Sequence, residues 1–116
     1  MDNQILFDKL KKDSIENDEL IFGLNSEKHN IIGLTILAII ERKYCNEQII
    51  IRLVLIGTLL KDHKLFGLYQ IGHMAIAALY LIGDEKAQSK YYELYEELSD
   101  DDKYIVDNFI KENISI

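Results

Sequence analysis

A run of tyrosines and carboxylates near the C-terminal end contains the residue types best suited to surface recognition. The run extends from Lys90 to Asp102. Tyr92 and Glu96 stand four residues apart, so a helix places them side by side on one face. Tyrosine offers a large contact area at a small entropic cost, and carboxylates pair with Lys and Arg. The run predicts a surface for a basic protein partner, formed by Tyr92, Tyr95, Glu93, Glu96, Glu97, Asp100, Asp101 and Asp102.

The same run also contains side chains that belong to the core. Ala87, Tyr91, Leu94 and Leu98 recur at spacings of four, three and four, so Tyr91 is expected to be buried. Tyr95 is expected at the edge of this apolar stripe. An alternative interpretation is that the exposed tyrosine is only tolerated and that the charges form a solvated face.

The residues that could catalyse a reaction do not form a recognisable site. His29, His63 and His73 lack the H-x-x-x-H spacing of a metal site on one helix, and we expect them at the surface or half-buried. Cys45 lies at a helix start, where the pKa of a thiol can fall, but a lone cysteine is more often a small buried residue. G-x-S-x-G and phosphate-loop motifs are absent from the sequence. We therefore expect no enzyme activity, metal or cofactor.

The charge balance narrows the class of partner. The 116 residues include 20 acidic and 13 basic side chains, for a net charge of -7. This charge disfavours nucleic acid and anionic membranes, and it favours fast encounter with a basic protein. Acidity that only keeps the protein in solution is the alternative.

Nothing in the sequence indicates export or a membrane span. The N-terminus lacks a secretory signal, and one cysteine cannot form an internal disulfide. The longest stretch without formal charge, residues 65–83, contains Gln70, His73 and three glycines, so we do not expect a transmembrane helix. We expect a cytoplasmic protein.

The elements that must position these residues are predicted to be helices. The sequence lacks proline and strand-like alternation of apolar and polar residues. We expect Ser26, Asn46, Asp84 and Ser99 to cap helices and Gly83 to end one. The expected helices cover about 3–12, 15–24, 27–43, 46–61, 68–82, 84–98 and the residues after Ser99.

Two of these helix pairs repeat. Gly33–Ile40 aligns with Gly72–Leu79 at an offset of 39, and Asn46 aligns with Asp84 at an offset of 38. A period of about 40 residues with two helices per unit is typical of a HEAT or armadillo-like solenoid. The expected organisation is atypical N-terminal helices in 1–25, repeat units in 26–62 and 65–99, and a C-terminal helix in 100–116.

The segment Ala77–Ala87 resembles the repeat core of short HEAT-like proteins. It has an Ala-Leu helix end, an Ile-Gly-Asp turn, and then an acidic residue and Ala. Ser99 to Asp102 matches the acidic turn that opens the next repeat, but Tyr104 and Ile105 stand where that family often has Arg and Ala. The resemblance implies an all-α, short α-solenoid of about six helices that acts as a binding scaffold.

Small acidic helical binders are frequent among bacterial immunity proteins, which neutralise a toxin. Colicin-type DNase immunity proteins also present tyrosines among carboxylates to a basic nuclease, although this chain lacks their sequence pattern. By this analogy we expect an immunity protein that occludes a basic, nuclease-like toxin. A HEAT-like scaffold or regulatory subunit for another protein is the main alternative. A HEAT-like nucleic-acid glycosylase is a third, but it would need a basic groove.

Overall fold

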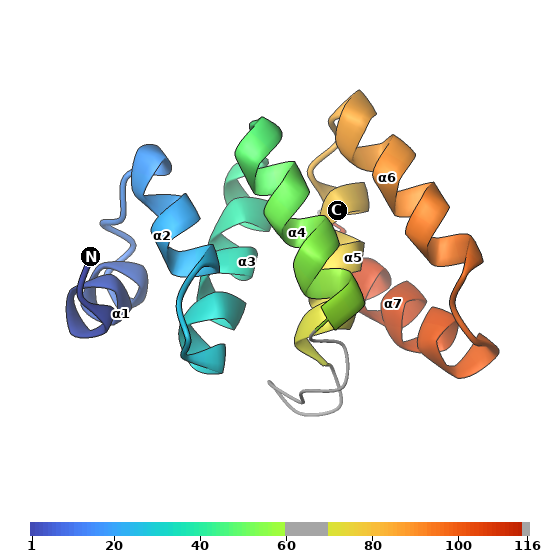
Figure 1. Cartoon of the computed structure of the whole chain (residues 1–116), viewed down its shortest axis with the longest axis horizontal. Helices are drawn as coiled ribbons and strands as arrows, with labels where there is room; N and C mark the ends of the chain where they lie inside the picture. The colour runs from blue at the N-terminus through green and yellow to red at the C-terminus, as the bar shows by residue number, and fades with distance from the viewer. Residues whose placement is uncertain (60–69, 115–116) are drawn as a thin grey trace.

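The computed structural model describes residues 1–59 and 70–114, and seven α-helices occupy most of them (Figure 1). The prediction of an all-α fold is confirmed. The expected end of one helix near Lys61 and the start of the next at Leu68 lie outside the described residues. The helices are α1 (Asn3–Lys11), α2 (Leu20–Leu24), α3 (His29–Arg42), α4 (Glu47–Leu59), α5 (Ile71–Leu81), α6 (Glu85–Glu96) and α7 (Asp100–Asn113), with a 3-10 turn, η1 (Asn17–Glu19), before α2.

The helices alternate between two layers. In one layer α1 packs against α3, α3 against α5, and α5 against α7. In the other, α2 packs against α4 and α4 against α6. The predicted units 26–62 and 65–99 correspond to α3 with α4 and to α5 with α6, and the boundary between these units lies outside the described residues.

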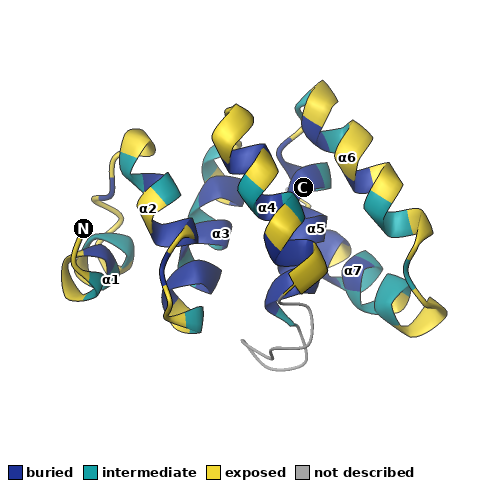
Figure 2. Ribbon diagram, in the orientation of Figure 1, coloured by how far each residue is buried: buried dark blue, intermediate teal, exposed yellow. Residues whose placement is uncertain are grey.

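Helix α5 is the centre of the fold because its own sequence leaves it no polar face. It contains no Asp, Glu, Lys or Arg, and all its residues except Tyr80 are buried (Figure 2). It contacts α3, α4, α6 and α7. Close approach of α4 requires a missing side chain, because a Cβ at Gly57 would lie 2.9 Å from Cγ1 of Ile76. An apolar helix covered on several sides removes a large hydrophobic area from water.

The helix boundaries predicted from capping residues are largely confirmed. The side chains of Asn46, Asp84 and Ser99 each accept a hydrogen bond from the backbone N–H three residues later, at 2.9, 3.0 and 3.2 Å. These bonds satisfy N–H groups that the first helical turn leaves unpaired. Gly83 follows α5 with a φ of 81°, a left-handed conformation that glycine adopts without a steric penalty.

Ser26 does not cap α3 as predicted. The helix begins at His29, two residues later than expected, and its N-cap is Lys28. The Ser26 hydroxyl instead accepts from the Lys28 N–H at 3.0 Å and donates to Oδ1 of Asn3 at 2.9 Å. The bond from Ser26 to Asn3 joins the segment before α3 to α1. The spacing of residues within one helix does not reveal a contact of this kind.

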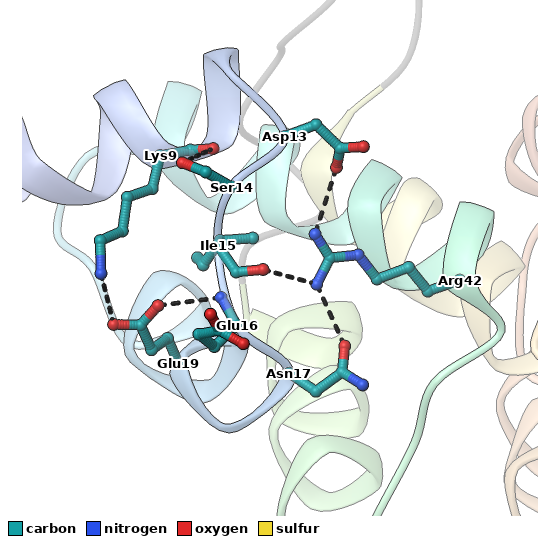
Figure 3. Close-up of polar contacts among 8 residues, drawn as sticks. All are labelled: Lys9, Asp13, Ser14, Ile15, Glu16, Asn17, Glu19 and Arg42. Carbon is teal, nitrogen blue, oxygen red and sulfur yellow. Dashed lines mark hydrogen bonds and ion pairs between the residues drawn. The ribbon is translucent and has the colours of Figure 1, made fainter.

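Arg42, at the end of α3, joins the N-terminal segment to that helix through hydrogen bonds (Figure 3). Its guanidinium donates to the Ile15 carbonyl at 2.8 Å, to Asn17 at 3.0 Å and to Asp13 at 3.1 Å. Asp13 has a φ of 53°, so the turn after α1 is in a left-handed conformation. One side chain therefore organises the connection that leads from α1 into η1.

A second polar contact closes the same region from the other side (Figure 3). The Lys9 ammonium lies 2.7 Å from Glu19, whose other carboxylate oxygen accepts from the Glu16 N–H at 2.9 Å. The bond from Lys9, followed by that from Glu16, lowers the pKa of Glu19 below its usual 4.5. Glu19 is thus held ionised between α1 and the start of α2.

Replacing Arg42 by Met is expected to destabilise the protein by about 1–3 kcal/mol, because three acceptors, the Ile15 carbonyl, Asn17 and Asp13, lose their donor at once. Urea unfolding followed by circular dichroism measures the change. Arg52→Met is the matched control, since Arg52 makes one backbone contact of this kind, to Leu24 at 3.3 Å. Equal losses in the two variants would contradict the role given to Arg42.

The Lys9–Glu19 contact predicts a pH-dependent part of the stability. Because the folded-state pKa of Glu19 is lowered, its contribution is full above the ordinary pKa of 4.5 and is lost as the pH falls through the lower folded value. Lys9→Met should therefore lower the melting temperature more at pH 7 than at pH 3. Lys12→Met serves as the control for removal of one positive charge. A similar difference between the two pH values for both variants would refute the assignment.

Candidate functional site

The tyrosines of α6 divide between the core and the surface as predicted. Tyr91 is buried at 6% exposure, Tyr92 is 55% exposed, and Tyr95 is half-buried. The helix packs against α4 and α5, so the stripe that includes Tyr91 faces those helices. Tyr92 stands on the outer side with Glu96 one turn away.

Four tyrosines form one aromatic cluster centred on Tyr91. Its ring centroid lies 5.1 Å from Tyr80 of α5, 5.1 Å from Tyr92 and 5.3 Å from Tyr95. The rings are tilted or edge-on, arrangements that aromatic pairs favour. A groove of about 350 Å³ opens beside them. We call it the tyrosine groove, and it is lined by Tyr80, Tyr91, Tyr92, Tyr95, Asp107, Ile110 and Lys111.

Tyr95 is fixed within this groove by α7. Its hydroxyl donates to the Asp107 carboxylate, with both oxygens at 3.0 Å. The Lys103 ammonium lies 5.4 Å from the centre of its ring, within the range of a cation–π contact. Contacts to two residues of α7 therefore set the position of Tyr95.

The hydroxyls of Tyr91 and Tyr95 stay protonated near neutral pH. Burial raises the pKa of Tyr91 most, and Tyr95 and the Asp107 carboxylate raise it further. Burial and the bond to Asp107 also raise the pKa of Tyr95. The groove thus offers aromatic rings beside the Asp107 carboxylate and the Lys111 ammonium.

Most carboxylates of the predicted contact surface are exposed. Glu96 and Glu97 lie at the end of α6, and Asp100 and Asp101 lie in the first turn of α7. Glu93 is exposed as well and lies 3.5 Å from Lys90, a contact worth little at a surface. The structure therefore places these exposed groups on the second half of α6 and around the turn from α6 to α7.

Asp102 differs from these neighbours because it points inward to His73. Nε2 of His73 lies 2.8 Å from its carboxylate, and the Asp102 side chain is only 26% exposed. His73 itself is completely buried, so the expectation of a surface or half-buried histidine is wrong. The reason is its place on α5, whose neighbouring residues are all buried. Asp102 joins α7 to the core and is left out of the contact surface proposed below.

One ring nitrogen of the buried histidine is unpaired among the residues that the structure describes. Within residues 1–59 and 70–114, Nδ1 of His73 has no hydrogen-bond partner. Burying a ring nitrogen without a hydrogen bond lowers the stability of the fold. The hydrogen bond to Asp102 offsets part of the free-energy cost of burying the His73 ring. Sequence reasoning missed this pair because its members are 29 residues apart.

Cys45 gives no sign of an activated thiol. Burial raises its pKa, and the nearby Asp84 carboxylate raises it further. This direction is opposite to the fall that a helix start can produce. The carboxylate that caps α6 therefore counteracts any effect of the helix dipole on this thiol.

An exposed apolar stripe on α4 was also missed. Ile51, Leu55 and Leu59 are 62%, 40% and 65% exposed and lie at successive turns of one face. The buried residues Ile49, Leu53 and Ile56 lie on the other side of this helix. The sequence contains a signal for the exposed stripe, because the apolar residues Ile51, Leu55 and Leu59 repeat every four positions.

The comparisons with known proteins leave the site to be judged on its geometry. No family model matches the chain, and no curated protein or solved structure matches it significantly. In the described part of the chain, no three His, Cys, Asp or Glu side chains come together as a metal site would require. His63 lies outside that part. None of the described helices is both long enough and apolar enough to cross a membrane.

Asp102→Ala should destabilise the protein by about 1–3 kcal/mol, because the buried His73 loses its hydrogen bond. Asp101→Ala removes the same charge from the same helical turn and should change stability by less than about 0.5 kcal/mol. Chemical denaturation of the two variants separates the contact from the helix-dipole effect. If both variants unfold at the same denaturant concentration, the His73 contact does not stabilise the fold.

Proposed function

We propose that this protein is a binding module that recognises a basic protein through the outer face of α6 and the start of α7. The observation that carries this proposal is the exposure of Tyr92 beside Glu96, at the edge of a groove lined with three further tyrosines. Exposed tyrosines with access to a groove are frequent anchors of protein interfaces. The net charge of -7 supports a partner of opposite charge.

In this proposal the residues of the face have different roles. Tyr92 and Tyr95 are the anchors, the first exposed and the second half-buried in the groove. Binding would occlude the partner surface without any chemical step. The carboxylates that pair with Lys and Arg of the partner are Glu93, Glu96, Glu97, Asp100 and Asp101.

The biological role that we propose is that of a cytoplasmic immunity protein that neutralises a basic, nuclease-like toxin. The support is a small, acidic, all-helical chain with tyrosines and carboxylates on one accessible face. A toxin that binds nucleic acid has a basic surface, because phosphate contacts dominate such binding. An acidic inhibitor that competes for that surface associates rapidly.

A HEAT-like scaffold or regulatory subunit is the second candidate. Two layers of alternating helices and the sequence offset of 38 to 39 residues support a short solenoid. The exposed stripe of Ile51, Leu55 and Leu59 on α4 favours this candidate specifically, because a scaffold contacts partners through more than one surface.

Affinity capture from the source cells tests the proposed surface. The double variant Tyr92→Ala/Glu96→Lys should weaken binding of a basic partner by about tenfold or more, because an anchor is lost and a charge is reversed. The control Phe22→Ala/Glu41→Lys makes the same changes at exposed residues of α2 and α3 and should retain the partner.

The identity and activity of the captured protein then decide between the two roles. A nuclease that loses activity on addition of one equivalent of this protein would support the immunity role. A partner without toxic activity would favour the scaffold. Retention of the same partner by both double variants would place the binding surface elsewhere and reject the proposed one.

A further inference from the structure

We infer that the tyrosine groove is a receptor for one cationic side chain, the guanidinium of Arg or the ammonium of Lys. This inference rests on the proposed function, because the basic partner would supply that side chain. It goes beyond the exposed carboxylates, since it assigns recognition to the hollow between α6 and α7. Three properties of the groove support a receptor: its volume, its aromatic rings and its charged side chains.

The groove has the dimensions of a site for a single side chain. Its volume of about 350 Å³ lies at the low end of the range of small-ligand sites. Tyr92 is the most exposed member of the aromatic cluster, so a ligand can reach its ring from solvent. Tyr91, which contacts the other three rings, is buried and gives the groove a rigid back wall.

The rings present an electronegative surface that suits a cation. The face of an aromatic ring attracts an ammonium or guanidinium within about 6 Å of its centre. The protein already makes such a contact here, because Lys103 lies 5.4 Å from the centre of the Tyr95 ring, so an incoming cation would use the other rings of the groove. Asp107 adds a formal negative charge that the Tyr95 hydroxyl holds in place at 3.0 Å. A bound guanidinium would combine ring contacts with a charge-assisted hydrogen bond.

Two like charges oppose a bound cation: Lys103 already lies over the Tyr95 ring, and Lys111 lines the same groove. Lys111 is exposed and lies one turn beyond Asp107 on α7, so its long side chain can move into solvent. Tyr91 and Tyr95 both have raised pKa values to which Asp107 contributes, so the groove also resists further negative charge. Lys111 therefore acts as a competitor of the ligand rather than as its binding group.

Titration followed by NMR of the tyrosine rings tests the inference. The probe is Nα-acetyl-arginine amide, and inorganic phosphate is the anionic comparison. The arginine probe should shift the signals of Tyr92 and Tyr95, and phosphate should not. Tyr92→Leu and Asp107→Asn should each weaken binding about two- to fivefold, whereas Lys111→Met should strengthen it by a similar factor. Phe22→Leu, at an exposed aromatic residue of α2, should change nothing.

Whether Lys111→Met strengthens or weakens binding decides whether the groove binds a cation or an anion. If phosphate shifts the rings and Lys111→Met weakens its binding, the groove is an anion site and the inference is overturned. It is also overturned if the arginine probe leaves the rings of the folded protein unshifted.

Partner capture separates this result from the proposed function. Capture that depends on Tyr92 and Glu96, without arginine binding, keeps the interface and rejects the receptor. Arginine binding without such capture does the reverse.

Discussion

Burial of α5 is the constraint on which the rest of the structure depends. A helix without any charged side chain cannot remain in water, so its neighbours must cover it. Four helices do so, and the alanines of α5 and Gly57 of α4 allow them to approach closely. The two-layer order of the molecule follows from this, because α3 and α7 flank α5 in one layer and α4 and α6 cover it from the other.

The candidate site is a consequence of the same packing. Because α6 and α7 both pack on α5, side chains of both helices line one groove together with Tyr80, near the end of α5. The apolar part of each tyrosine stabilises this junction, while the hydroxyl of Tyr95 reaches Asp107. The proposed binding groups are therefore continuous with the core, since the exposed ring of Tyr92 packs on the buried ring of Tyr91. Support of this kind reduces the entropy lost when a complex forms.

The acidic residues after Ser99 have different roles, although all of them are aspartates. Their carboxylates stabilise the N-terminus of α7, since negative charge there complements the helix dipole. Asp102 also reaches into the core to His73, whereas Asp100 and Asp101 remain exposed. The proposed recognition surface thus shares one short stretch of sequence with contacts that stabilise the fold, and Asp100 and Asp101 are its exposed members.

The sequence by itself determined the helices, three of their N-caps, the stop at Gly83 and the burial of Tyr91. These features depend on residues within one or two turns of each other, where spacing specifies geometry. Tertiary structure alone decided the pairing of His73 with Asp102, the bridge from Ser26 to α1 and the closure of the groove by α7. Hydrophobic periodicity specifies which face of a helix is buried, but the helix that lies across that face is set by packing of the whole chain.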